Sequence, residues 1–357
     1  MANAGASVCW TVVADELNRI RGISMNRKNV PMVANRKGSL PRVYGDTPSF
    51  LGVDVVDINR LEKGRDVIFS GVPWEGTVTW GSFSGCELAP RAIRHSAARY
   101  GGFLPEYELD FFDYLTVADA GDVSVDPNSP EKTMNNIYSS MDRIYGKGSI
   151  PVTVGGDHSI TPPIVDALGN NAKGPIGILH FDAHLDNAKV FGEDLFARCS
   201  PLHRIAQNEK VRTESIVHIG IRGPRNSPSQ LEYAWQIGAR VFNIREIRER
   251  GMTSVIDEAL RIASNQTEHV YVTICSDCID ASFNPGGPAD FNGLFPHELF
   301  SALYTIGRAG ISGLDYVEVY PIQDPNSFSS HLASWAIIHA LVGLASGKKK
   351  KSETATA

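Results

Sequence analysis

The chain contains 357 residues, of which 42% are hydrophobic and 21% are charged, a balance typical of a soluble protein with a filled core. Its formal net charge of -6 argues against an extended phosphate-binding surface, so no nucleic-acid partner is expected. The apolar stretches fall short of the roughly 20 residues that cross a bilayer, and five scattered cysteines do not suggest a secreted disulfide framework. The sequence therefore predicts a cytoplasmic protein with free thiols and no membrane contact.

Prolines and basic residues interrupt every apolar run in residues 1–60, so we predict an N-terminal arm there. From residue 61 to residue 346, short β-branched runs alternate with helical stretches, which is typical of a parallel sheet between helices. The runs are nearly continuous in apolar residues, so both faces of the sheet should be covered. The expected strands are residues 67–71, 150–154, 176–181, 216–221, 241–244, 270–274 and 312–319. The predicted fold is a three-layer α/β/α domain with a central, mostly parallel β-sheet.

The C-terminal segment, residues 347–357, has a different composition from the rest of the chain. It contains four consecutive lysines followed by small polar residues. Such a composition cannot bury a core, so we predict a disordered, Lys-rich tail.

Polar clusters follow three of the expected strands, where open α/β sheets bind their ligands. In the first cluster, paired glycines permit a tight turn that presents His158. In the second, Asp182, His184 and Asp186 alternate, so an extended backbone would point all three to one side. Burying two carboxylates beside an imidazole is costly unless a cation compensates them. Mixed histidine and aspartate ligands suit Mn, Ni, Zn or Fe. The third cluster places Asp277 as a further candidate ligand.

Together, the three clusters resemble the GGDH, DAHxD and SxDxDxxD motifs of the ureohydrolase family, which includes arginases and agmatinases. Other segments also resemble this family's motifs. Residues 71–73 and 90–94 are similar to its GVP and GPRAIR segments, residues 293–298 to GGLxxxE, and residues 314–321 to LDVVEVNP. The resemblance implies an arginase-like fold that hydrolyses a C–N bond of a guanidino compound with two divalent metal ions, Ni2+ or Mn2+.

The resemblance also implies roles for individual residues. The implied metal ligands are His158, Asp182, His184, Asp186 and Asp277. Glu298, in the segment that resembles GGLxxxE, is matched to the catalytic carboxylate that holds the substrate guanidinium. Asp277 is also expected to assist proton transfer to the leaving amine.

The sequence departs from the family pattern at two functional positions. Cys275 stands where the family has a sixth ligand, an aspartate that bridges both ions, and a thiolate is a softer ligand with a single donor atom. Arg198 stands where the family has a proton-shuttling histidine, and an arginine cannot shuttle protons near neutral pH. His203 is a possible substitute for that histidine. Cys275 and Cys278 also form a CxxC, for which a redox or zinc site is the minor interpretation.

These departures leave two interpretations of function open. In one, the chain is an active ureohydrolase for guanidine, a methylated guanidine, a biguanide or a guanidino acid, with Trp74 and Asn187 as candidate substrate contacts in the loops that set specificity. In the other, it is a degenerate, non-catalytic subunit that supports an active paralogue, as in heteromeric members such as metformin hydrolase. The family implies a homo- or hetero-oligomer, trimeric or hexameric. A histone-deacetylase-like site with a single zinc is a weaker third alternative.

Overall fold

The computed structural model describes residues 48–79 and 83–356 of the chain. Its centre is a nine-stranded sheet in the order β1-β5-β2-β6-β11-β10-β7-β8-β9, and the neighbouring strands pair in parallel. The strands are β1 (Asp54–Val55), β2 (Val67–Val72), β5 (Val117–Asp122), β6 (Ile150–Gly155), β7 (Ile176–Phe181), β8 (Val211–Ile221), β9 (Arg240–Asn243), β10 (His269–Cys275) and β11 (Gly313–Val317). A separate antiparallel ribbon pairs β3 (Phe103–Leu104) with β4 (Leu109–Asp110).

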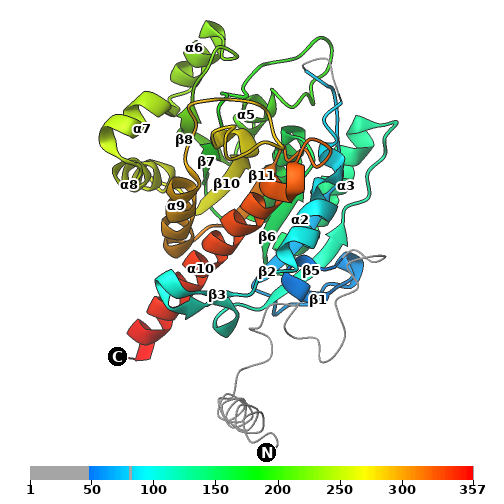
Figure 1. The fold of residues 1–357 in the computed structure, drawn as a ribbon, viewed down its shortest axis with the longest axis vertical. Helices are drawn as coiled ribbons and strands as arrows, with labels where there is room; N and C mark the ends of the chain where they lie inside the picture. Colours follow the sequence, from blue (N-terminus) through cyan, green and yellow to red (C-terminus); the bar gives the residue numbers. More distant parts are fainter. Residues whose placement is uncertain (1–47, 80–82, 357) are drawn as a thin grey trace, which may run out of the picture.

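Helices cover both faces of this sheet and complete the three predicted layers (Figure 1). One apolar core joins the sheet to α2 (Ala89–Ala97), α7 (Ile244–Arg250), α8 (Met252–Ala263), α9 (Pro296–Ala309) and α10 (Phe328–Thr356). A second core joins the opposite face to α3 (Pro130–Gly146), α4 (Thr161–Asn171), α5 (Pro201–Ile205) and α6 (Pro228–Gln236). The three-layer α/β/α prediction is therefore confirmed.

Helices α9 and α10 show how local sequence sets the packing. In α9, Leu299, Leu303 and Ile306 recur at helical spacing and are buried, which makes one apolar stripe. Helix α10 crosses this stripe closely, because a Cβ added at Gly343 would lie 2.3 Å from the carbonyl oxygen of Tyr304. A larger residue at this glycine would force the two helices apart.

All seven expected strands are present, although β8 begins at Val211 instead of residue 216. Strands β1 and β5 were not expected. The sequence of β5, Val-Ala-Asp-Ala-Gly-Asp, lacks the apolar run of its neighbours because Asp119 is buried in it. Arg94 on α2 pairs with both carboxylate oxygens of Asp119, at 2.8 and 2.9 Å. The charge of Asp119 made β5 look unlike a core strand in the sequence. In the fold this charge is compensated by Arg94, 25 residues away along the chain.

The ends of the domain differ from the prediction. Residues 48–60 belong to the domain and not to an arm, because Phe50 is buried and stacks on Phe69 with ring centroids 4.3 Å apart. The rest of the predicted arm, residues 1–47, lies outside the described residues. At the other end, α10 continues as a helix to Thr356, where we predicted a disordered tail. Lysine is a good helix former, and Lys348 bonds Asp66 at 2.6 Å.

Helix α10 is also long and apolar enough to span a membrane by length and composition, over Pro325–Thr354. However, 78% of its most apolar window is buried inside the fold. This burial is that of a core helix, and it agrees with the packing of α10 on α9.

Candidate metal centre

The carboxyl ends of four adjacent central strands, in the order β6, β11, β10 and β7, bring the predicted clusters together. After β6, the chain turns through Gly156, where an added Cβ would lie 2.2 Å from the carbonyl oxygen of Trp74. Only glycine allows this approach. Asp157 then accepts a hydrogen bond from the Ser159 N–H and caps the short turn that carries His158. The expected tight turn is present.

The ring of His158 is oriented by a chain of hydrogen bonds below the site. The Thr273 hydroxyl on β10 donates to Asp315 on β11 at 2.6 Å, so the same hydroxyl accepts from Nε2 of His158, at 2.9 Å. With its Nε2 proton bonded to this hydroxyl, the imidazole turns Nδ1 toward Asp182 and Asp186, each with an oxygen 3.1 Å away. A ring nitrogen directed at two carboxylates, with the other nitrogen held by a hydroxyl, fits ligands around a shared cation.

Asp182 is the central residue of the cluster. Its Oδ2 lies 3.1 Å from Nδ1 of His158, and its Oδ1 lies 3.3 Å from Nδ1 of His184. On the second side, His184 Nδ1 is also 3.1 Å from Oδ2 of Asp277, whose Oδ1 accepts from the Ala183 N–H. Asp182 therefore contacts His158 with one carboxylate oxygen and His184 with the other. The five predicted ligands, Asp182 included, come together here.

Cys275 lies at the end of β10, between these groups. Its sulfur and one oxygen each from Asp182 and Asp277 lie within 4.8 Å of one another, and all three side chains are buried. Burial, followed by the negative charge of Asp182, raises the pKa of the Cys275 thiol well above its usual value. The thiol thus lies among the candidate ligands, and it contributes no charge unless a cation lowers its pKa.

Two residues at the edge of the cluster were not predicted. Asp290 places Oδ2 3.4 Å from Nε2 of His184, on the opposite side of the ring from Asp182. It is also bonded to Arg225. A carboxylate behind a ligating histidine orients the ring and increases its basicity. Nothing in the residue spacing pointed to Asp290, because it lies in the loop after β10 and outside the three polar clusters.

The protonation balance of the cluster indicates that it suits a cation. Burial raises the pKa of Asp186, and the neighbouring charge of Asp182 raises it further. Burial lowers the pKa of His158, but Asp182 and Asp186 outweigh burial and raise it well above its usual value. Burial also raises the pKa of Asp182, yet hydrogen bonds from His158, His180 and His184 hold it well below its usual range. Clustered buried carboxylates that hold protons on imidazoles fit divalent cations in both charge and ligand type.

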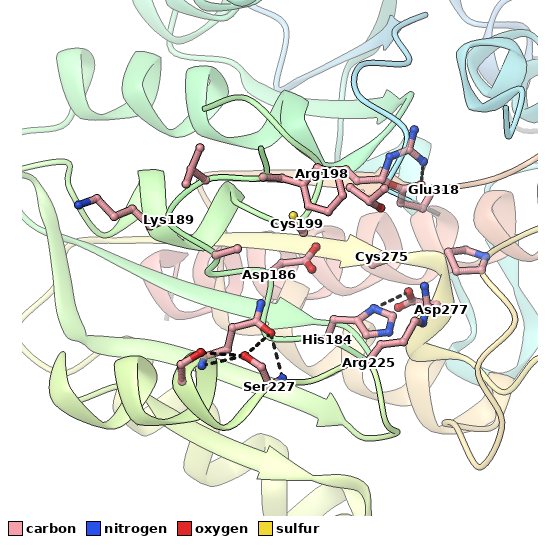
Figure 2. Close-up of a pocket in the computed structure, with 17 residues that line it drawn as sticks. His184, Asp186, Lys189, Arg198, Cys199, Arg225, Ser227, Cys275, Asp277 and Glu318 are labelled. Carbon is pink, nitrogen blue, oxygen red and sulfur yellow. Dashed lines mark hydrogen bonds and ion pairs between the residues drawn. The ribbon is translucent and has the colours of Figure 1, made fainter. Parts of the chain in front are cut away.

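A cavity of about 570 Å³ opens onto this cluster (Figure 2). Its wall includes Thr79, His184, Asp186, Ala188, Lys189, Val190, Phe191, Arg198, Cys199, Arg225, Ser227, Ser229, Gln230, Cys275, Asp277, Pro288 and Glu318. Figure 2 shows His184 directed toward Asp277, with Arg198 and Glu318 lying together on another part of the wall. The cavity can admit a small organic molecule next to the candidate ligands.

Glu318 is the carboxylate of the cavity wall that lies outside the candidate ligand set. It follows β11 with a left-handed φ of 63°, and its Oε1 accepts from the backbone N–H of His158 at 2.9 Å. Burial raises its pKa to about 7, although Arg198 acts in the opposite direction. We did not single out Glu318 from the sequence. Glu318 directly follows a core strand, as the three polar clusters do, and this position could have identified it from the sequence.

The three predicted substrate contacts lie elsewhere. Glu298 is at the start of α9, where it accepts from the Phe295 N–H at 2.8 Å and pairs with Arg248 at 2.5 Å. Trp74 is buried in the segment that follows β2, and the amide of Asn187 bonds the Gln230 carbonyl. None of these three side chains is part of the cavity wall. His203, the suggested substitute for the shuttle, also lies outside the wall, where it packs against Tyr233.

A parallel α/β/α fold with a histidine and aspartate cluster at its strand ends fits a hydrolase of the class that uses divalent metals. Residues 65–343 match the profile described as Arginase family, which covers most of the chain. The chain belongs to this family of ureohydrolases. It is 30% identical to a mitochondrial agmatinase of Gallus gallus over 269 residues, covering 75% of this chain and 77% of the relative.

Two further comparisons agree with this family. The chain is 30% identical to a mitochondrial guanidino acid hydrolase of Homo sapiens over 313 residues, covering 85% of this chain and 87% of the relative. The solved structure of proclavaminate amidino hydrolase from Streptomyces clavuligerus superposes with a TM-score of 0.79 at 26% identity, covering 85% of this chain and 99% of that one. The three names imply different substrates, so family membership does not by itself give the substrate of this chain.

Proposed function

We propose that the chain hydrolyses the C–N bond of a small guanidino compound and releases urea, or a substituted urea, and an amine. The observation that carries this proposal is the meeting of His158, Asp182, His184, Asp186 and Asp277 at one edge of the sheet, beside a cavity. Membership of the arginase family supports the same chemistry.

The proposed cofactors are two divalent ions, Mn2+ or Ni2+, held by these five residues with Cys275 as a sixth candidate. Such ions would supply an activated water and stabilise the charge that develops on the reacting group. Carboxylate oxygens favour Mn2+, whereas the sulfur of Cys275 favours a softer ion such as Ni2+. The ligand set therefore accommodates either ion, and the metal content of the purified chain distinguishes them.

The chain's own residues have two proposed tasks. Asp277 is the candidate that carries a proton to the leaving amine, because it lines the cavity while His184 and the Ala183 N–H hold its two oxygens. We propose Glu318, in place of Glu298, as the carboxylate of the cavity's cation subsite, because Glu318 lines the cavity and Glu298 does not. In this chain Arg198 donates to it at 3.1 Å. A carboxylate suits a planar cation because it accepts paired hydrogen bonds.

Among the four substrate classes expected from the sequence, the cavity best supports a guanidino acid. Lys189 and Arg225 line the wall together with Ser227, Ser229 and Gln230, a set that suits a carboxylate at the far end of the substrate. Trp74, the aromatic substrate contact expected from the sequence, is buried outside the wall.

The test is urea release by the purified full-length chain, supplied with Mn2+ or Ni2+. The panel comprises guanidine, methylguanidine, a biguanide, short guanidino acids, agmatine and arginine. We expect a short guanidino acid to give urea and amine in equal amounts. Asp182→Asn should abolish turnover, whereas Asp166→Asn, an exposed aspartate on α4, should retain it. Absence of turnover in the metal-loaded chain, across the panel, would sink the proposal.

Cys275 and Arg198 support a second candidate, a non-catalytic subunit that acts with an active paralogue in a homo- or hetero-oligomer. By the resemblance to the family, Cys275 would stand in place of a bridging carboxylate. Arg198, which is bonded to Glu318, would stand in place of the shuttling histidine. The two candidates differ in metal content. About two metal ions per chain, measured by mass spectrometry of the chain expressed alone, would favour the enzyme. A metal-free chain that raises the activity of a co-expressed paralogue would favour the subunit.

A further inference from the structure

The cavity contains a guanidinium group that belongs to the chain itself. Arg198 lies in the segment before α5, and its side chain is only 3% exposed. It pairs with three carboxylates. Its Nη1 donates to Oε2 of Glu318 at 3.1 Å, and its Nη2 donates to Oε1 of Glu75 at 3.0 Å and lies 3.6 Å from Oδ2 of Asp157. Figure 2 shows the pair of Arg198 and Glu318 in the cavity wall.

The acceptor positions of Glu318 are nearly filled by the protein. Oε1 accepts from the His158 N–H at 2.9 Å, while Oε2 accepts both Nη1 of Arg198 and the hydroxyl of Tyr320, the latter at 2.8 Å. An ionised carboxylate accepts about four hydrogen bonds. A second planar cation would need paired acceptors on this carboxylate, and it would have to remove Arg198 to obtain them.

We propose that Arg198 is an internal guanidinium that occupies the cation-binding subsite at Glu318, and thereby closes this subsite to the guanidinium group of a ligand. The inference rests on the proposed function only in taking the cavity as the place where a guanidino compound would bind. It implies that a substrate of this chain places its guanidino group on the side of His184 and Asp186, without support from Glu318.

The surroundings of Arg198 keep it in place. Glu75 is itself fixed by three further donors, the N–H and hydroxyl of Ser84 and the N–H of Gly85. Burial lowers the pKa of Arg198, but the charges of Glu318 and Asp157 outweigh it and raise the pKa above the usual arginine value. The side chain thus stays charged at every working pH, and its partners are held in position by other bonds.

The same geometry predicts what removal of the side chain would leave. Glu318, Glu75 and Asp157 would surround a space that has the size and charge preference of a guanidinium ion. Arg198→Ala should therefore bind free guanidinium, because the ion can restore the three pairs that the side chain made. A wild-type chain with the subsite filled should not.

The experiment is a titration of the full-length, metal-supplied protein with guanidinium chloride, far below denaturing concentrations, against sodium chloride at equal ionic strength. Calorimetry gives the affinity, and the shift in Tm gives an independent readout. We expect Arg198→Ala to bind guanidinium at least about tenfold more tightly than wild type. The double variant Arg198→Ala/Glu318→Gln should lose this gain.

Arg204→Ala is the matched control. Arg204 lies six residues further on and bonds backbone carbonyls and the amide of Gln207, not carboxylates, so its removal should create no guanidinium site. If Arg198→Ala does not fold, Arg198→Gln undergoes the same titration, because it keeps amide donors without the charge. No gain in a folded Arg198 variant would overturn the inference.

The wild type provides a test that needs no Arg198 variant. Guanidinium binding to wild type that disappears in Glu318→Gln would also overturn the inference, since it would show an open subsite. These outcomes are distinct from failure of the proposed function, which is measured by urea release. If the wild type turns over substrate but binds no guanidinium at Glu318, both the proposed function and the closed subsite are supported. Guanidinium binding by Arg198→Ala can be measured whether or not the chain turns over substrate.

Discussion

The sulfur of Cys275 lies within 4.8 Å of a carboxylate oxygen of Asp182, at the point where the two halves of the candidate metal centre meet. Asp182 contacts the imidazoles of both halves, so a donor beside it would face both ions. A carboxylate offers two oxygens at this position, whereas a thiolate offers one soft donor. The identity of residue 275 should therefore control both metal affinity and metal preference.

We predict that Cys275→Asp increases Mn2+ affinity by at least about tenfold and shifts the preference from Ni2+ toward Mn2+. A third carboxylate beside Asp182 and Asp277 should also destabilise the metal-free protein, so the rise in Tm on adding Mn2+ should exceed that of wild type. Metal content by mass spectrometry and Tm with and without Mn2+ measure both effects. Cys278→Ala, a buried cysteine outside the cluster, should change neither preference nor the metal-dependent rise.

Thr273 supports the same centre from below. Its hydroxyl links Nε2 of His158 to Asp315, so Thr273→Val should leave the imidazole free to rotate while keeping the volume of the side chain. Loss of such supporting bonds typically lowers metal affinity about 10–100-fold. A chelator competition assay measures this. Thr153→Val, on strand β6 beyond β11, removes a buried hydroxyl that bonds Ser70 and should leave metal affinity unchanged. Equal losses in both variants would contradict a specific role for Thr273.

The sequence predicted the central strands and brought the five candidate ligands to attention because each depends on local order. Buried β-branched runs mark the strands, and His158 or Asp277 follows a strand end directly. Strand β5 escaped prediction because the charge of Asp119 is compensated by Arg94, a contact that exists only in the folded chain.

The carboxylate of the cavity wall was missed for a related reason. Motif spacing drew attention to Glu298, but the fold turns this residue toward Arg248 and turns Glu318 into the cavity. Arg198 was noticed in the sequence as a lost proton shuttle. Its pairing with Glu318, Glu75 and Asp157 required the tertiary structure, because these residues come from three distant segments.

Glu298→Gln separates the motif-based role of this residue from its observed one. The structure makes it part of the α9 cap and a partner of Arg248, so the variant should lose about 0.5–1 kcal/mol of unfolding free energy. Metal content should not change. A double-mutant cycle with Arg248→Gln, followed by urea denaturation, would measure the coupling of the pair. If Glu298→Gln keeps wild-type stability but loses turnover, the prediction is wrong and Glu298 acts on the substrate.

Asp110, at the end of β4, should give the fold a measurable dependence on pH. Burial raises the pKa of its carboxyl from 3.8 to about 6, while a hydrogen bond from the Phe112 N–H acts in the opposite direction and the charge of Asp113 adds to the rise. Between pH 3.8 and about 6, the folded carboxyl binds more protons than the unfolded one. This group's contribution to stability therefore falls as the pH rises through that window.

Asp110→Asn should remove this loss, because the amide oxygen still accepts from the Phe112 N–H but carries no charge. Above pH 6 the variant should be more stable than wild type by about 1 kcal/mol, a value reduced for partial solvent screening, and near pH 4 the two should be equal. Urea denaturation at a series of pH values measures the difference. Asp113→Asn, an exposed neighbour, should reduce the slope only slightly. A stability difference that stays constant across the window would show that Asp110 is ionised throughout, and that burial does not hold its proton.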